Sequence, residues 1–593
     1  MPDLSQTQPF AFTCEGGLVK NRSTFIMQPG QALELLNFEP DIKGGYRRIN
    51  GFKRYVRQIV PQTSASSEKV LMTALFNNNI VAARGQKIFS SASTELGTLS
   101  THAIAADTSM TGSGTITVKT TSGFSSSGTL QINSEQFTYT GKTTTTFTGV
   151  TRAVNSTTAA AHSASGETSQ TVVSENWTER DTGRTNAGKY TFERFNFDGN
   201  EKLIVADGVN DPTVFNTSFS ATDVTESSVE GAKFVTAFRE HMFYAGMSST
   251  PQEIVFSQPF DEDAFNTGSG AGSVKVDDTI VGLKVFRENL FIFGKDKIFK
   301  LSGTALANFA VAPVTRNIGC IDGGSIQELA GDVVFLAPDG LRTIAGTARI
   351  GDVELGTISK QVQKRIDDIT THNINSLVIR SKSQYRLFFP TSTSQAEQAA
   401  QGLIAVIKTN PATGQLGFEY ADMKQIKVSA CDSDFISGTE TIVHGGYDGF
   451  VYKQETGNEL TRASTTTTID SFYRSPDLHM GDPGIRKKMQ RVIFNYDNTG
   501  NVSATFKLVY DFADPDSPQP SAFSLTTGAG VALYDLAATT YGTAVYDSSG
   551  ASLVRQPVEG SGFTVAVRLD DTSTNPPLEL KGYEMEFIPG DRR

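Results

Sequence analysis

The sequence predicts an all-β protein built around a β-propeller, and three observations support this prediction. Of the 593 residues, 54 are glycines, and 39 phenylalanines stand against a single tryptophan. Glycine and short polar residues form tight turns, whereas phenylalanine and valine favour half-buried strand faces. The third observation is a recurring unit in which an apolar strand is followed by a tight turn and a second strand.

The recurring unit is spaced as the blades of a propeller would be. Its strands are centred near residues 203, 243, 291, 335, 387 and 443, so that successive units lie 40 to 56 residues apart. Propeller blades repeat at roughly 40 to 50 residues, and because one blade cannot bury its own faces, blades stack in a ring until it closes. We expect six to eight blades within residues 61–110 and 169–458.

Two further domains are predicted outside the blades. A unit near residue 80 precedes the next one by 123 residues, too many for one blade. Residues 111–168 account for the surplus, because their short strands alternate apolar residues with Thr, Ser or Gln, and we expect a small β domain inserted into a blade loop. Residues 459–593 contain longer alternating strands with long loops, which favours a C-terminal β-sandwich. These strands are 491–496, 505–510, 563–569 and 583–588.

Three shorter segments complete the prediction. Residues 1–60 are expected to form an N-terminal docking segment, in which 31–38 make a turn or two of helix and 44–55 a turn leading into an edge strand. The strongest helix signal covers 359–369, because Val362, Ile366 and Ile369 fall on one face of a helix. Its expected role is core packing, with Thr357 or Ser359 as the N-cap.

The charge balance limits the possible partners. Lys and Arg number 52 against 63 Asp and Glu, a net charge of −11. Proteins that grip nucleic acid through its phosphates normally have a basic surplus, so stable wrapping of DNA is not expected, although DNA could slide past an acidic surface. No run approaches the roughly 20 apolar residues of a spanning helix. The start of the chain has no export signal, so synthesis in the cytoplasm is expected.

The sequence offers no motif for catalysis, for a metal or for a cofactor. The six histidines include no HExxH and no close pair, and no CxxC pair occurs. Residues 141–143 resemble the end of a phosphate-binding loop, but Gln136 stands where its first glycine belongs. We therefore expect no catalytic residue, no cofactor and no enzyme. Some propellers are glycosidases, and paired carboxylates can converge in space, so a propeller glycan hydrolase remains an alternative. The three cysteines are Cys14, Cys320 and Cys431.

The order of elements between residues 283 and 390 is specific. Strand and turn motifs at 286–294, 298–303, 317–320 and 334–337 are followed by a helix at 358–362 and a strand at 385–390. This order resembles the packaged-DNA-stabilisation and tail-nozzle proteins of short-tailed bacteriophages. The segment 29–52 is similar to the start of many such proteins, and the insert resembles small β modules of phage structural proteins.

The resemblance implies a structural virion protein, made in the host cytoplasm and located in the phage tail. It implies a ring of identical subunits, usually six, that docks below the portal and adaptor, extends the DNA channel and helps to retain and eject the genome. The implied partners are other copies of the chain, the adaptor and portal, tail fibres and double-stranded DNA in transit, without insertion into a membrane. A fibre-anchoring or receptor-binding tail protein is the alternative within the virion.

Two groups of residues are candidates for these contacts. The adaptor-facing patch would be basic and the loops at the lumen or tip acidic. The patch comprises Arg47, Arg48, Lys53 and Arg54, and the loop residues are Asp511, Asp514 and Asp516.

Overall fold

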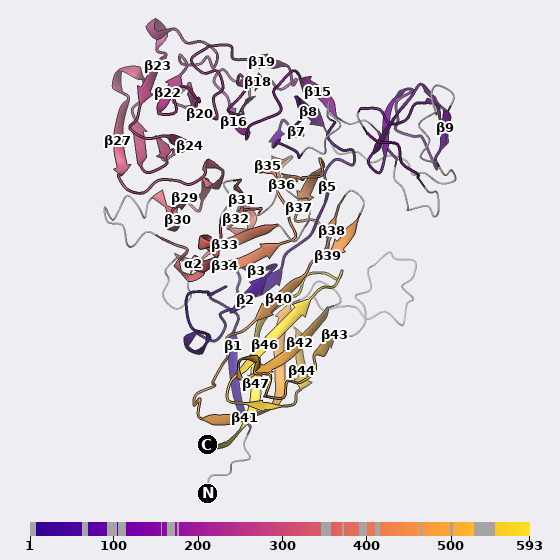
Figure 1. Ribbon diagram of the computed structural model, residues 1–593, viewed down its shortest axis with the longest axis vertical. Helices are drawn as coiled ribbons and strands as arrows, with labels where there is room; N and C mark the ends of the chain where they lie inside the picture. The colour runs from indigo at the N-terminus through magenta and orange to yellow at the C-terminus, as the bar shows by residue number, and fades with distance from the viewer. Residues whose placement is uncertain are drawn as a thin grey trace.

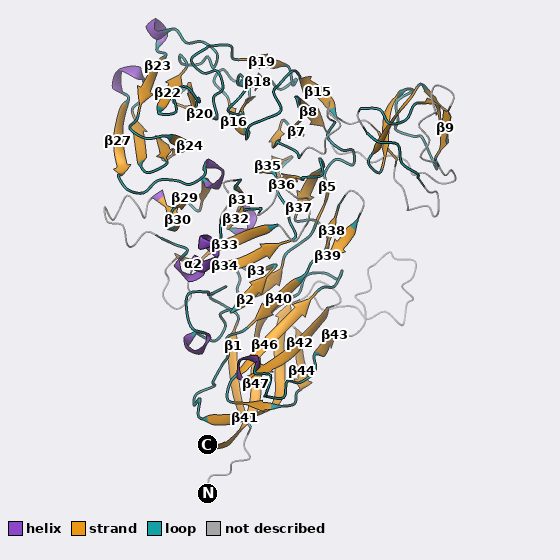
Figure 2. Ribbon diagram, in the orientation of Figure 1, coloured by secondary structure: helices purple, strands orange, loops and turns teal. Residues whose placement is uncertain are grey.

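The computed structural model describes residues 7–61, 69–91, 104, 114–155, 157–162, 172–174, 177–344, 357–369, 373–390, 400–409, 416–462, 465–497, 502–526 and 552–592. The molecule is elongated, with a propeller at one end, a β-sandwich containing the first and last strands at the other, and a small domain projecting from the side of the propeller (Figure 1). Strands dominate and the helices are short (Figure 2). The predicted fold, a propeller with an inserted β domain and a C-terminal sandwich, is confirmed.

Seven sheets within the described residues form the blades of the propeller. The innermost strands of neighbouring blades contact one another around the ring, with the contact between blades four and five made by β24 and the short helix η4 (Gly323–Ser325) that precedes β28. The first, β6, contacts the last, β35, which closes the ring. The strands of each blade are given from the inside outwards. Blade one is β6 (Met72–Phe76), β7 (Asn79–Arg84), β8 (Lys87–Ser91) and β15 (Thr178–Asp181), and blade two is β16 (Thr191–Phe195), β17 (Lys202–Ala206), β18 (Thr213–Phe215) and β19 (Ala221–Asp223). Blade three is β20 (Phe234–Phe238), β21 (His241–Ala245), β22 (Glu253–Phe256) and β23 (Gly272–Lys275).

The remaining blades follow the same plan, and the second strand of every blade contains one of the seven centres predicted from the sequence. Blade four is β24 (Ile280–Phe286), β25 (Asn289–Gly294), β26 (Ile298–Ser302) and β27 (Ala310–Thr315); blade five is β28 (Gln327–Leu329), β29 (Asp332–Ala337) and β30 (Gly340–Thr343); blade six is β31 (Asn375–Ile379), β32 (Gln384–Phe388), β33 (Gln401–Thr409) and β34 (Leu416–Lys424); and blade seven begins with β35 (Ala430–Ile436), β36 (Thr439–Gly445) and β37 (Val451–Gln454).

The N-terminal segment is woven through the whole molecule. Strand β5 (Phe52–Arg54) pairs with β37 and so supplies the fourth strand of blade seven, and β38 (Glu459–Thr461) and β39 (Thr466–Thr468) extend that sheet. Strand β2 (Glu34–Leu36) lies between β34 of blade six and β40 (Ser471–Arg474) of the sandwich. Strands β1 (Gln8–Thr13) and β4 (Tyr46–Arg48) pair with the last strand, β47 (Glu579–Arg592), and β3 (Phe38–Pro40) pairs with β4.

Two sequence predictions for this segment were wrong. Residues 31–38 are not helical, because β2 is hydrogen-bonded to strands on both sides while Leu35 and Phe38 enter the main core; tertiary pairing outweighs a weak helical period. Residues 44–55 do not form an edge strand, since β4 lies between β3 and β47, and β5 lies between β37 and β38. Residues 8–54 are therefore an internal part of both large domains.

The propeller and the sandwich share one sheet and one core. Blade six continues through β2 and β40 into β46 (Val565–Asp571), β42 (Ser503–Tyr510) and β43 (Phe523–Thr526), a sheet of nine strands. The opposing sheet consists of β3, β4, β47, β41 (Ile485–Asp497) and β44 (Ser552–Pro557), with β1 on β47 and β45 (Ser561–Gly562) on β41. A single buried cluster includes Phe388 of blade six together with Phe494 and Phe506 of the sandwich.

The inserted domain has a core of its own. It enters the chain between β8 and β15, the third and fourth strands of blade one. Two small sheets, β11–β10–β14 and β12–β13–β9, enclose a separate cluster that contains Ile116, Phe137 and Phe147. Its strands are β9 (Gly114–Thr117), β10 (Gly128–Ile132), β11 (Glu135–Tyr139), β12 (Gly141–Lys142), β13 (Thr146–Val150) and β14 (Val172–Ser174).

The predicted helix at 359–369 is present but short. It consists of η5 (Lys360–Val362) and α2 (Gln363–Asp367), with Val362 and Ile366 buried and Ile369 packed on the same core. Ser359 does not cap it by its side chain; its hydroxyl accepts a hydrogen bond from Leu341 N instead. The described residues include no helix long and apolar enough to cross a membrane. The other short helices are η1 (Thr24–Ile26), η2 (Thr267–Ser269), η3 (Leu306–Asn308), η4 (Gly323–Ser325), η6 (Arg380–Lys382) and η8 (Asp511–Ala513).

Candidate functional site

The channel on the propeller axis is the main cavity of interest. It has a volume of about 1080 Å³, and it is lined by residues on or next to the innermost strands β16, β20, β24, β28, β31 and β35. Polar atoms make up more of its exposed lining than apolar atoms do, in contrast to the apolar interior of the blades. The charged lining residues are Lys189, Glu193, Arg194, Lys233, Lys284, Asp322, Glu328, Arg380 and Asp432.

Two of these charges pair with acids from other blades. Lys189, just before β16, donates to Asp322 at 2.7 Å and to the carbonyl oxygen of Ile374 at 2.6 Å. Arg194 at the end of β16 forms ion pairs with Asp432 and, at 3.2 Å, with Asp434 on β35. These contacts link blade two to blades five, six and seven, so they hold the ring together and leave the paired carboxylates occupied.

Glu193 lies between these pairs, on the middle of β16. Burial raises the pKa of its carboxyl to about 7, and the positive charges of Lys284 and Arg194 offset part of this rise. A carboxyl group that titrates near neutral pH in a cavity is a feature typical of functional sites. Glu193 can therefore give up or take up a proton under ordinary conditions.

Replacing Glu193 with glutamine should stabilise the protein in a pH-dependent way. Because the folded-state pKa is raised above the usual 4.5, the fold loses stability as pH rises through 7, and the variant escapes this loss. We expect the free energy of unfolding to rise by about 2 kcal/mol at pH 8 and the gain to fade towards pH 4.5. Urea unfolding followed by fluorescence of the single tryptophan measures it. A loss of stability at pH 8 would mean that attraction to Lys284 outweighs burial.

The predicted adaptor-facing residues do not form one exposed patch. Arg48 is fully buried: its guanidinium donates to Asp571 at 2.9 Å and to the carbonyl oxygen of Ser573 at 2.6 Å, which ties β4 to the sandwich. It has no surface to offer a partner. Lys53 is exposed, and Arg54 is half-buried with its guanidinium over the ring of Phe450.

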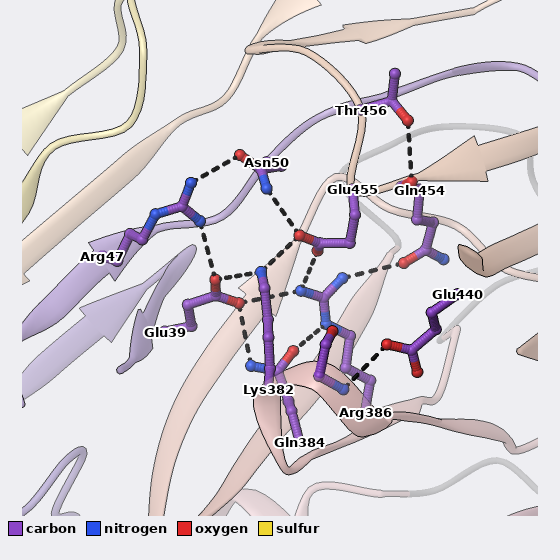
Figure 3. A network of polar contacts seen from close by, with 11 residues as sticks. Glu39, Arg47, Asn50, Lys382, Gln384, Arg386, Glu440, Gln454, Glu455 and Thr456 are labelled. Atoms are coloured by element: carbon purple, nitrogen blue, oxygen red, sulfur yellow. Dashed lines mark hydrogen bonds and ion pairs between the residues drawn. The ribbon is translucent and has the colours of Figure 1, made fainter. Parts of the chain in front are cut away.

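Arg47 belongs to a polar network between the N-terminal segment and blades six and seven (Figure 3). At its centre the buried Arg386 of β32 donates to Glu39 of β3 at 3.1 Å and to Glu455 at 2.5 Å. Lys382 bridges the same two carboxylates, at 2.5 Å each. Glu455 is buried, which would raise its pKa, but Arg386 and Lys382 hold the pKa well below its usual range. The network acts as a structural joint.

The predicted acidic loop residues lie in the sandwich, just after β42, and not along the propeller channel. Asp511 Oδ1 accepts hydrogen bonds from Phe563 N at 2.7 Å and Thr564 N at 3.1 Å, so this residue fixes the local backbone. Asp514 and Asp516 are exposed. Their exposure suits a loop contact, whereas Asp511 has a structural role.

Metal and thiol chemistry find little support in the described residues. Among these residues, no group of three or more His, Cys, Asp or Glu side chains is placed to hold a metal ion. Burial raises the pKa of the Cys320 thiol to about 12 and that of the Cys14 thiol in the same direction, so neither is a ready nucleophile.

The channel residues were missed by the sequence analysis. Lys189, Glu193 and Lys284 carry no motif, and they meet only because different blades surround the axis. A signal was present in the period of the repeat: residues just before each innermost strand share one end of the ring, and lysine recurs there. That position could have been examined once the blades were aligned.

Comparisons with known proteins do not assign the chain to a family. No family model and no curated protein matches the chain. Similar solved structures include Chaetomium thermophilum Raptor (7% identity, TM-score 0.33, 70% of this chain and 30% of that one), Kluyveromyces lactis Hsv2 (8%, 0.26, 59% and 97%) and the extracellular domain of a hybrid two-component system protein from B. thetaiotaomicron (8%, 0.33, 76% and 44%). The chain thus spans less than a third of Raptor. At these scores the likenesses carry no argument about function.

Proposed function

We propose that the chain is a subunit of the tail nozzle of a short-tailed bacteriophage. Copies of it would form a ring that extends the DNA channel below the portal and adaptor and helps to retain and eject the genome. The observation that carries the proposal is that the two large domains form one continuous unit: the propeller and the sandwich share a nine-stranded sheet and a core. The resemblance of the strand order to nozzle proteins points the same way.

The charge of the chain is compatible with this role. DNA that must leave the particle should not adhere to the channel wall, and a net charge of −11 disfavours adhesion through the phosphates. In a ring of identical subunits each interface joins two different surfaces of the chain and closes by rotation. A subunit whose propeller and sandwich share a sheet and a core would transmit force along the tail without changing the shape of the ring.

A fibre-anchoring or receptor-binding tail protein is the second candidate, and the inserted domain is the observation that favours it. The insert has a separate core and projects from the side of the propeller (Figure 1). A domain attached in this way could contact a partner without disturbing the blades. This role can coexist with the nozzle, or it can be the main function of the chain.

Native mass spectrometry and electron microscopy of the full chain, alone and mixed with portal and adaptor, test the proposal. We expect sixfold rings that bind the adaptor, with the chain alone as the control for self-assembly. A trimer that does not bind the adaptor would contradict the proposed nozzle function and favour a fibre-anchoring or receptor-binding protein. A monomer that hydrolyses a host polysaccharide would contradict both and favour the glycan hydrolase.

A further inference from the structure

Four lysines stand at equivalent positions of four blades. Lys69 precedes β6 by three residues, Lys189 precedes β16 by two, Lys233 precedes β20 by one, and Lys427 precedes β35 by three. The innermost strands of a propeller run in the same direction along its axis, so the residues that precede them meet at one mouth of the channel. We call these four residues the lysine collar.

Hydrogen bonds connect the blades at this end of the ring. The Thr191 hydroxyl donates to the carbonyl oxygen of Lys233 at 2.7 Å, next to Lys189 in the chain. Lys189 in turn donates to the carbonyl oxygen of Ile374, whose neighbour Asn373 donates to the Tyr447 hydroxyl at 2.9 Å. Lys189, Lys233 and Asn373 also line the cavity.

Tyr447 is flanked by the other two lysines of the collar. The ammonium group of Lys427 lies 4.3 Å from the centre of its ring, and that of Lys69 lies 5.6 Å from it. The Nζ atom of Lys427 is buried and has no hydrogen-bond partner. Burial lowers the pKa of both lysines, and the charge of Lys189 lowers that of Lys69 further. Holding the ammonium groups of Lys69 and Lys427 in this buried position costs solvation free energy.

Three acids near this mouth are already engaged. Asp322 pairs with Lys189. Asp278, before β24, accepts hydrogen bonds from the backbone of Thr279, Asp296 and Lys297, and Asp277 pairs with the side chain of Lys297. Within the described residues no carboxylate pairs with the ammonium groups of Lys69, Lys233 or Lys427. Three of the four collar lysines therefore lack a paired carboxylate among the described residues, although the protein as a whole is acidic.

We propose that the lysine collar binds a small multivalent oxyanion, a polyphosphate or a polycarboxylate, at the mouth of the propeller channel. A ring of like charges at a cavity concentrates ions of opposite sign. Lysine ammonium groups donate to phosphate and carboxylate oxygens from several directions. Lys189 and Lys233 line the cavity of about 1080 Å³, which has room for such a ligand. The argument for a nozzle subunit rests on none of these four lysines. The anion site can therefore be tested independently of the proposed function.

Titration calorimetry of the full chain with tripolyphosphate and with citrate tests this site. We expect saturable binding of one anion per chain that weakens as salt is raised. Lys427→Gln and Lys233→Gln should each weaken it about tenfold. Lys233 is exposed, so its replacement keeps the fold intact even if that of Lys427 does not. Lys275→Gln, on the outer strand β23, removes an equal charge from a 72% exposed side chain and should leave binding unchanged.

The two ligands distinguish the source of the oxyanion. Tighter binding of tripolyphosphate would assign the site to phosphates, and tighter binding of citrate to carboxylates. The proposal is overturned if neither anion binds saturably at millimolar concentration, or if binding survives both Lys427→Gln and Lys233→Gln. It is also overturned if duplex DNA binds the collar while neither small anion does.

Discussion

Replacing Arg386 with methionine should lower the free energy of unfolding by about 3 to 5 kcal/mol. The Arg386 guanidinium is fully buried and donates to Glu39, Glu455, Gln384 and Gln454. Methionine fills similar space but leaves the two buried carboxylates with Lys382 and, for Glu39, the more distant Arg47 as their cations. Uncompensated buried charge is costly, whereas an intact pair is close to neutral. The loss should loosen the contact of the N-terminal segment with blades six and seven.

Arg47→Met provides the matched control in the same network. Arg47 contacts Glu39 at 3.4 Å from a side chain that is 24% exposed, so its removal should cost less than about 1 kcal/mol. Urea unfolding followed by the fluorescence of Trp177 reports both variants, because this indole donates to the carbonyl oxygen of Gln58 and packs in the core between blades one and seven. Equal costs for the two variants would refute the account of the network as a joint.

Replacing Glu135 with glutamine should open the inserted domain while the propeller stays folded. Glu135 is buried, which raises its pKa, but hydrogen bonds from His162 and Arg152 outweigh this and bring the pKa down to about 2. The Arg152 guanidinium donates to Glu135 at 2.9 and 2.6 Å from a side chain that is 1% exposed. Glutamine removes the carboxylate charge that both Arg152 hydrogen bonds reach in this buried site, at a cost of about 3 kcal/mol.

Hydrogen exchange measured on peptides of the insert tests this prediction. A cost of this size corresponds to about a hundredfold faster exchange in β10, β11 and β13, with the blades unchanged because the insert has its own core. The folded-state pKa of Glu135 lies below the usual value, so its stabilisation is complete above about pH 4.5 and is lost as pH falls towards 2. The difference between variant and wild type should shrink accordingly. Glu179→Gln, at an exposed pair with Lys87 on the adjacent blade, is the control and should change little.

Local features of the fold could be predicted from the sequence. The strand pair around Leu290 and Ile298 and the strands of the insert depend on alternation and on turn residues within a short stretch, and the structure has them where expected. The repeat spacing supplied the propeller, since it reflects the length of four short strands with their turns.

Long-range pairing could not be predicted in the same way. Leu35 carries no mark of its neighbours on β34 and β40, which lie hundreds of residues later in the chain. The buried state of Arg48 follows from Asp571, whose position beside it is fixed only by the sandwich. The candidate channel residues were missed for this reason as well. The sequence of a basic segment does not reveal whether its charged groups face water or a buried carboxylate.

The pairing of β1 with β47 imposes an order on biosynthesis. Gln8 aligns with Phe587, so β1 waits for a partner that is synthesised 579 residues later. At roughly 5 to 20 residues per second, this wait lasts about half a minute to two minutes. Throughout it, the strands of the N-terminal segment remain without their final neighbours and open to wrong association. A chain truncated before β47 lacks the partner of β1, and we expect such fragments to be less soluble than the full chain.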